Sequence, residues 1–116
     1  MSHHLSLHPI AEGVFAAPQL TPEAMAEAAR LGIKAVMNNR PDHEHGPGQP
    51  TSDEIAAAAA AAGLAYRHLP VAGGFQTPEQ IAACRTLLAE LPRPLLMFCR
   101  SGARSTKLYH QAIALG

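Results

Sequence analysis

Apolar and polar positions along the chain form a repeated pattern of strand followed by helix. Short strands are predicted at residues 13–17, 33–38, 65–71 and 95–98, and a helical segment follows each of them. Repeated strand–helix units favour a mostly parallel sheet with helices on both faces. We therefore expect a three-layer α/β fold with about four to five strands, built as one domain over residues 1–116.

Capping residues predict where two of the helices begin. Thr51 and Glu54 have the spacing of a capping box before a run of alanines that Gly63 ends, and Thr77 with Gln80 has the same spacing. In such a box, each side chain satisfies a backbone amide that the first helical turn leaves free. Both helices are therefore expected to begin at these threonines.

The other two helices are predicted from weaker signals. Thr21 is expected to cap a helix that ends at Gly32, and the last helix is expected to start near Arg104 or Ser105 and run to Gly116. Between these elements, residues 39–50 contain three prolines and two glycines and cannot form regular structure. Loops of this length are uncommon unless they have a function or move.

Charge and hydropathy exclude several classes of partner. The chain has 9 Lys and Arg against 9 Asp and Glu, so no net field attracts nucleic acid or an anionic membrane. No apolar run approaches the roughly 18 residues of a membrane span, and residues 1–10 do not resemble a secretion signal. Two cysteines fit a reducing compartment. We expect a cytoplasmic protein that binds neither nucleic acid nor membrane.

Cys99 is the strongest candidate for a reactive group. It follows the apolar strand at 95–98 and precedes a turn of small residues and a helix, which places it in the crevice where parallel sheets bind ligands. The amides of residues 100–104 can converge above the sulfur, and the helix adds its positive end. Such a position lowers the pKa of a thiol. We expect Cys99 to be a thiolate nucleophile.

The residues after Cys99 suit an anionic substrate. Arg104 can offer a planar, bidentate fork to an oxyanion, Gly102 permits a tight turn, and Ser105 can hydrogen-bond the thiolate or assist product release. The predicted substrate cradle consists of four consecutive loop residues: Arg100, Ser101, Gly102 and Ala103. The alternative is that Cys99 is simply a packed core thiol.

A second polar cluster follows the strand at 33–38. Asn38 and Asn39 are expected to tie loops together at the site mouth, and Arg40 to hold an anionic part of the substrate. The alternative is a structural Asx turn before the proline at 41. Asp42 is a candidate acid or base, and Glu44 is a second candidate for the same role.

The remaining cysteine and the histidines are predicted to be structural or solvent-exposed. Cys84 lies on the inward stripe of its helix, which favours core packing over a role as resolving thiol. His43 and His45 lack a matching second cluster, so we expect no metal site and no cofactor. Three histidines are expected to be disordered or on the surface: His3, His4 and His8.

Four segments carry a resemblance to a known family: C-R-S-G-A-R-S at 99–105, N-N-R-P-D-H-E at 38–44, Q-P at 49–50 and Y-R-H-L-P-V at 66–71. Together they resemble the phosphatase-like domain of bacterial beta-lactamase hydrolase-like proteins. That family is similar in fold to protein tyrosine and dual-specificity phosphatases, and some members are fused to persulfide-handling metalloenzyme domains. The resemblance implies that Cys99 is the nucleophile and that Arg104 clamps the oxyanion.

Two departures from the tyrosine phosphatases affect the expected reaction. Four residues separate Cys99 from Arg104, as in rhodanese-type sulfurtransferases, where tyrosine phosphatases have five. Residues 72–74 also lack the acidic side chain that dual-specificity enzymes have there. Sulfur transfer between thiols needs no general acid. The prediction is therefore a thiol sulfurtransferase that carries a persulfide on Cys99 and has a persulfide-handling enzyme as a candidate partner. The alternative is a cysteine-based phosphatase.

Overall fold

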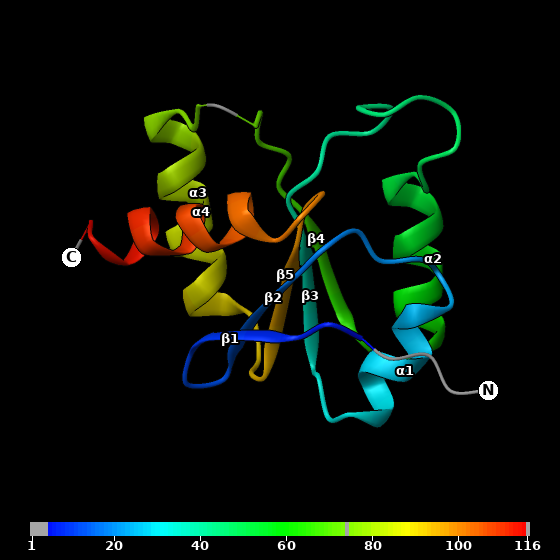
Figure 1. Cartoon of the computed structure of the whole chain (residues 1–116). Helices are drawn as coiled ribbons and strands as arrows, with labels where there is room; N and C mark the ends of the chain where they lie inside the picture. Colours follow the sequence, from blue (N-terminus) through cyan, green and yellow to red (C-terminus); the bar gives the residue numbers. More distant parts are fainter. Residues whose placement is uncertain (1–4, 74, 116) are drawn as a thin grey trace.

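A five-stranded sheet forms the centre of the molecule (Figure 1). The computed structural model describes residues 5–73 and 75–115. The strands run in the order β1-β2-β5-β3-β4, in which β2, β5, β3 and β4 are parallel and β1 pairs with β2 antiparallel. Their bounds are β1 His8–Ala11, β2 Val14–Ala17, β3 Ala35–Asn38, β4 Ala65–His68 and β5 Leu95–Phe98.

Four helices cover the two faces of this sheet. In Figure 1, α3 and α4 lie on one side of the strands, and α1 and α2 lie on the other. Their bounds are α1 Ala24–Arg30, α2 Ser52–Ala61, α3 Pro78–Glu90 and α4 Ala103–Ile113. The three-layer, mostly parallel α/β fold is thus confirmed. Within residues 5–73 and 75–115, no helix is both long and apolar enough to cross a membrane.

The central strand β5 is buried on both faces, which explains its uninterrupted apolar sequence. Leu95 and Met97 pack in the core cluster that includes α3 and α4 residues, whereas Leu96 and Phe98 pack in the cluster that includes α1 and α2 residues. All four side chains are fully buried. Successive side chains of a strand point to opposite faces, so a strand between two helical layers must be apolar at every position.

Both predicted capping boxes are present. The hydroxyl oxygens of Thr51 and Thr77 accept from the amides of Glu54 and Gln80, whose side chains accept from the threonine amides in return. Residues 22–23 form a turn, and α1 begins at Ala24, later than a cap at Thr21 implies. The Thr21 hydroxyl nevertheless accepts from the Ala24 amide at 3.3 Å, so it does bond the first turn of this helix.

The amino-terminal strand β1 was not predicted. Gly13, with φ +74°, makes the tight turn through which β1 folds back on β2. The pairing is irregular between Pro9 and Ala11, as expected where proline lies in an edge strand. His8, expected in a disordered or surface segment, is exposed but belongs to this strand, and His3 and His4 lie outside the described residues.

The carboxyl ends of β3, β4 and β5 meet at one edge of the sheet, at the top of Figure 1. The long loop at 39–50, the connection from β4 to α3 and the turn between β5 and α4 all leave from this edge. The predicted strands at 33–38 and 65–71 are shorter than expected, since β3 starts at Ala35 and β4 ends at His68. The residues after His68 therefore belong to the loops of this edge.

Candidate active site

Backbone amides surround the sulfur of Cys99 at the end of β5. The amide of Gly102 donates to Sγ at 3.1 Å, and the backbone amides of Ser105 and Ser101 also help to lower the pKa of the thiol. Burial of Cys99 by itself raises the pKa of the thiol, but these amides and the Ser105 hydroxyl together bring it below its ordinary value. The sulfur is thus buried and also prepared to carry a negative charge.

Gly102 gives the turn its shape. Its φ of +95° lies in the left-handed region that favours glycine, and it is the N-cap of α4. An added Cβ at this position would meet the carbonyl carbon and oxygen of Ala17 at 3.4 Å. The turn can therefore approach β2 closely while its amides point at Cys99, and the positive end of α4 lies beside the sulfur.

Ser105 and Asn39 connect the Cys99 turn to the loop after β3. The Ser105 hydroxyl donates to Oδ1 of Asn39 at 2.8 Å, and the Asn39 amide nitrogen donates to the Leu69 carbonyl at 3.1 Å. Both side chains are fully buried. Asn39 therefore ties three loops of this edge together, in agreement with the role expected for it.

Arg104 is held away from solvent by two partners outside its own loop. Its Nη1 donates to the Val71 carbonyl at 3.0 Å and lies 3.0 Å from Oε2 of Glu44, and its Nη2 donates to Oε1 of Glu44 at 3.2 Å. The side chain is 11% exposed. The planar fork of the guanidinium thus engages a carboxylate in the bidentate manner predicted for a substrate oxyanion.

Arg40 contacts the same carboxylate. Its Nε donates to Oε1 of Glu44 at 2.8 Å, and its Nη1 donates to the side-chain oxygen of Gln19 at 2.9 Å. Burial of Glu44 raises its pKa, but the hydrogen bonds and charges of Arg104 and Arg40 lower it below the ordinary value. In this arrangement Glu44 is an ionised counter-ion of two arginines and holds no proton to donate.

Asn38 and Asp42 make their hydrogen bonds elsewhere. Asn38 donates to the Tyr66 hydroxyl at 3.1 Å and accepts from the Arg40 amide at 2.9 Å. Asp42 accepts from the Ser52 amide at 2.7 Å, at the start of α2. Successive side chains of an extended segment point to opposite faces, so the side chains of Asn38 and Asn39 bind different partners. In this conformation Asp42 stabilises a helix end, and its catalytic role remains a prediction.

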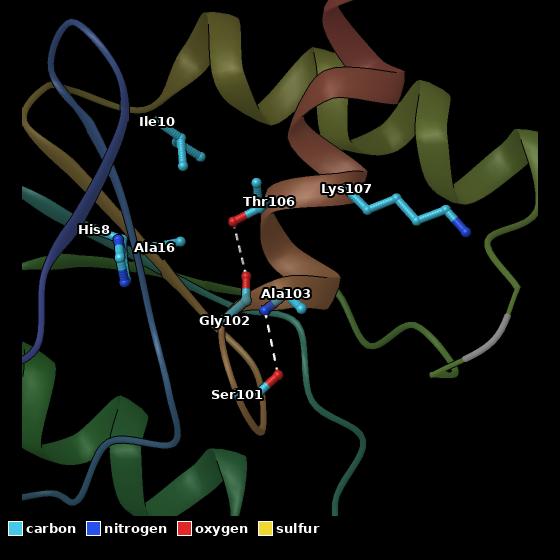
Figure 2. Close-up of a pocket in the computed structure, with 8 residues that line it drawn as sticks. All are labelled: His8, Ile10, Ala16, Ser101, Gly102, Ala103, Thr106 and Lys107. Carbon is cyan, nitrogen blue, oxygen red and sulfur yellow. Dashed lines mark hydrogen bonds between the residues drawn. The ribbon is translucent and has the colours of Figure 1, made fainter.

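Three of the predicted cradle residues, Arg100, Ser101 and Ala103, are exposed on the outer surface of the turn, whereas Gly102 is buried against β2. Arg100 and Ser101 are exposed; the Arg100 carbonyl accepts from the Gln19 amide at 3.2 Å, and the Ser101 hydroxyl accepts from the Ala103 amide at 3.3 Å. A cavity of about 500 Å³ lies against this turn, between β1, β2 and α4 (Figure 2). Figure 2 draws its eight lining residues, which are His8, Ile10, Ala16, Ser101, Gly102, Ala103, Thr106 and Lys107.

The second cysteine, Cys84, has the properties of a core side chain. It is fully buried in α3, among the residues of the core cluster beside α4. Burial raises the pKa of its thiol to about 12. Only Cys99, of the two thiols, has an environment that favours the thiolate.

Sequence patterns did not reveal three groups that shape the site. The Val71 carbonyl and the Gln19 side chain anchor the two arginines, and Gln49 organises the long loop by donating to the Pro41 carbonyl and accepting from the His45 amide. Gln49 is 8% exposed. A glutamine between glycine and proline in a long loop was the one available signal, because buried polar side chains in loops satisfy backbone groups.

Comparison with known proteins identifies relatives of the whole fold. The family described as "Beta-lactamase hydrolase-like protein, phosphatase-like domain" matches residues 6–116. A Beta-lactamase hydrolase-like protein from Xylella fastidiosa is 42% identical over 81 residues, which cover 70% of this chain and 19% of that protein. The chain thus spans about a fifth of the length of this relative.

Two of the solved structures that are similar to this chain illustrate its fold. A candidate phosphatase from Neisseria meningitidis has a TM-score of 0.79 and 31% identity, covering 87% of this chain and 71% of that one. A mutant form of Tk-PTP has a TM-score of 0.65 and 22% identity, covering 84% of this chain and 62% of that one. The second similarity concerns the fold alone, and the fold is that of tyrosine phosphatase-like proteins.

Proposed function

The chain belongs to the phosphatase-like domain family of beta-lactamase hydrolase-like proteins, and from this premise we propose that it is a cysteine-based phosphatase acting on phosphomonoesters. The observation that carries the proposal is the set of amides from Gly102, Ser101 and Ser105 directed at the Cys99 sulfur. Amides that stabilise a thiolate also stabilise the oxygens of a phosphoryl group held next to it. The sequence-based preference for sulfur transfer receives no support from the relatives.

In the first step, the Cys99 thiolate attacks the phosphorus atom. A sulfur–phosphorus bond forms, the bond from phosphorus to the ester oxygen breaks, and the leaving oxygen takes a proton from the solvent or from an acid. Arg104 and the turn amides hold the three other oxygens, where charge accumulates in the transition state. The product is a phosphocysteine.

In the second step, water attacks the phosphocysteine. An oxygen–phosphorus bond forms, the sulfur–phosphorus bond breaks, inorganic phosphate leaves with the protons of the water, and the thiolate returns. The Ser105 hydroxyl can donate a hydrogen bond to the departing sulfur, because it already lies within reach of Cys99. This assigns Ser105 a role in the release of phosphate.

Both acidic side chains of the long loop are engaged by other groups, which bears on the proton that the leaving group needs. Glu44 is ionised between two arginines, and Asp42 is bonded to the Ser52 amide. Asp42 can serve only if its loop moves. We propose that substrates whose leaving groups are stable as anions, such as aryl phosphates, react best, since they need little help from an acid.

Phosphate release from aryl phosphomonoesters tests the proposal. The wild-type chain and Cys84→Ser should release phosphate, and Cys99→Ser should not. Asp42→Asn should slow esters of alkyl alcohols more than aryl esters if Asp42 is the acid, and should slow both equally if it only stabilises α2. Phosphate release by Cys99→Ser at the wild-type rate would overturn the proposal.

Sulfur transfer stays as a second candidate because of one observation. Four residues separate Cys99 from Arg104, and the resulting turn is short. A sulfane-sulfur donor would then leave a persulfide on Cys99, and a persulfide-handling enzyme would be the partner. Intact mass after treatment with thiosulfate distinguishes the two functions, since only a sulfurtransferase gains one sulfur atom that Cys99→Ser lacks.

Location and partners are part of the same proposal. A nucleophilic thiolate must stay reduced, so a reducing compartment such as the cytoplasm is proposed. The expected partner is a small anionic substrate. Neither nucleic acid nor membrane is proposed, because the chain has no net charge.

A further inference from the structure

One carboxylate, that of Glu44, joins the two arginines of the site. Its oxygens lie 2.8 Å from Nε of Arg40, 3.0 Å from Nη1 of Arg104 and 3.2 Å from Nη2 of Arg104. Arg40 comes from the loop after β3 and Arg104 from α4. Two guanidinium groups from distant parts of the chain thus converge on one small anionic group.

Each arginine has anchors that do not depend on Glu44. The Nη1 group of Arg40 donates to the side-chain oxygen of Gln19. The backbone amide of Arg40 donates to Oδ1 of Asn38, and its carbonyl lies 2.8 Å from Nε2 of His68. Arg104 donates to the Val71 carbonyl. Both guanidiniums therefore stay in place when the carboxylate leaves, and the space between them becomes an anion site.

Glu44 is the most exposed of the three side chains. It is 26% exposed, whereas Arg40 and Arg104 are 6% and 11% exposed. The loop that carries it is fixed near both ends by Gln49 and by the Asp42 contact with Ser52. Release of both arginines therefore requires only that the Glu44 side chain turn toward solvent, without a change in the path of the loop.

The charges indicate which anion replaces the carboxylate. When the carboxylate leaves, the two guanidiniums present two positive charges in a partly buried region where little water screens them. A phosphomonoester carries two negative charges near neutral pH, as a phosphorylated side chain does. It also offers coplanar pairs of oxygens for both forks.

We propose that Arg40 and Arg104 together form the phosphate site of the enzyme, and that Glu44 occupies this site in the resting state as an internal competitor of the substrate. The proposal rests on the phosphatase function. It assigns Arg40 to the transferring phosphate itself, rather than to a remote part of the substrate. Glu44 then sets how strongly the enzyme binds phosphate and does not take part in the chemistry.

Binding of inorganic phosphate to the full chain, measured by titration calorimetry, tests the proposal. Glu44→Gln should tighten the phosphate Kd by about tenfold or more, because the neutral amide competes poorly for the arginines. Asp53→Asn is the matched control. It removes the same charge from an exposed side chain next to the loop, and it should change Kd by less than about twofold.

A second pair of variants tests the role of Arg40. In the Glu44→Gln background, Arg40→Gln should weaken phosphate binding by about tenfold or more. In the same background, Arg40→Lys keeps the charge but not the planar fork, so its phosphate Kd should lie between the values with Arg40 and with Arg40→Gln. An intermediate Kd also shows that the weaker binding does not come from a loss of folding. Phosphate binding that is equal with and without Arg40 would overturn the two-arginine site.

The direction in which Glu44→Gln changes the phosphate Kd shows whether Glu44 competes with phosphate. Unchanged or weaker phosphate binding would show that Glu44 orients the arginines for the substrate, and the proposed competition would be wrong. Calorimetry needs no turnover, so it separates this inference from the phosphatase function. If phosphate binds as expected but the chain hydrolyses no phosphomonoester, the phosphatase proposal is wrong and the two-arginine anion site still stands.

Discussion

The Ser105 hydroxyl lies within hydrogen-bond reach of both the Cys99 sulfur and the side-chain oxygen of Asn39. A hydroxyl has one hydrogen to donate, so it can serve only one of these two acceptors at a time. In the structure it donates to Asn39 at 2.8 Å. When Cys99 is ionised, the sulfur competes for the same hydrogen. The Ser105 hydroxyl can therefore donate to Asn39 when the sulfur is neutral and to Cys99 when the sulfur is ionised.

Removal of this hydroxyl should make Cys99 less reactive. Ser105→Ala removes a hydrogen bond that lowers the pKa of Cys99, and hydrogen bonds to charged groups contribute about 1.5–3 kcal/mol. We expect alkylation of Cys99 by iodoacetamide at neutral pH to slow by about tenfold or more. The rate is measured by mass spectrometry of the peptide that contains Cys99. An unchanged rate would show that the amides alone stabilise the thiolate.

Asn39 should contribute mainly to stability. Asn39→Ala removes the side-chain donor of the part-buried Leu69 carbonyl and the acceptor that the buried Ser105 hydroxyl uses in the structure. Unpaired buried polar groups cost about 1–3 kcal/mol each. Urea denaturation should show a loss of free energy of unfolding in this range. Asn38→Ala, which affects the Tyr66 hydroxyl instead, is the control that should leave the alkylation rate of Cys99 unchanged.

Alanine substitution at two glycines separates the effect of backbone strain on stability from an effect on activity. Gly102 and Gly63 have φ of +95° and +80°, so alanine at either position costs about 1–2 kcal/mol of stability. A Cβ at Gly102 would also meet Ala17 at 3.4 Å, whereas a Cβ at Gly63 has no neighbour within 4 Å. We expect both variants to be destabilised in urea and only Gly102→Ala to lose phosphatase activity. Equal activity of the two variants would argue against the role of the turn.

The pH dependence of Cys99 alkylation should show its lowered pKa. The rate follows the thiolate fraction, so it rises with pH through the pKa and then levels off. In the folded protein this rise should lie at lower pH than in the urea-unfolded chain, because the turn amides favour the charged form. Cys84 should not react in the folded state, since burial raises its pKa to about 12. A rise at the same pH in both states would contradict the proposed thiolate.

Much of the fold was predictable because local signals determine it. The capping boxes at Thr51 and Thr77 define the starts of α2 and α3, and the apolar run at 95–98 is β5, residue for residue. The strand β1 was missed because His8 and Pro9 give no strand pattern and the strand forms only by pairing with β2. Edge strands of this kind depend on tertiary contacts more than on their own sequence.

The candidate site was predictable in its centre and not in its surroundings. Cys99, Gly102 and Ser105 lie within one short segment, so their proximity follows from the turn itself. The contact of Glu44 with Arg104 joins residues 60 positions apart, and the loop at 39–50 that carries Glu44 has no periodicity from which its path can be predicted. Glu44 was accordingly predicted as a possible acid, whereas the structure pairs it with two arginines.

Detection of a phosphocysteine shows whether Cys99 carries the phosphoryl group. The Cys84→Ser chain is mixed with an aryl phosphomonoester, unfolded within the first turnover and analysed by mass spectrometry of its peptides. We expect one added phosphoryl group on the peptide that contains Cys99, and none after the further change Cys99→Ser. Phosphate release at the full rate with no phosphoryl group on Cys99, or with the group on another residue, would contradict this expectation.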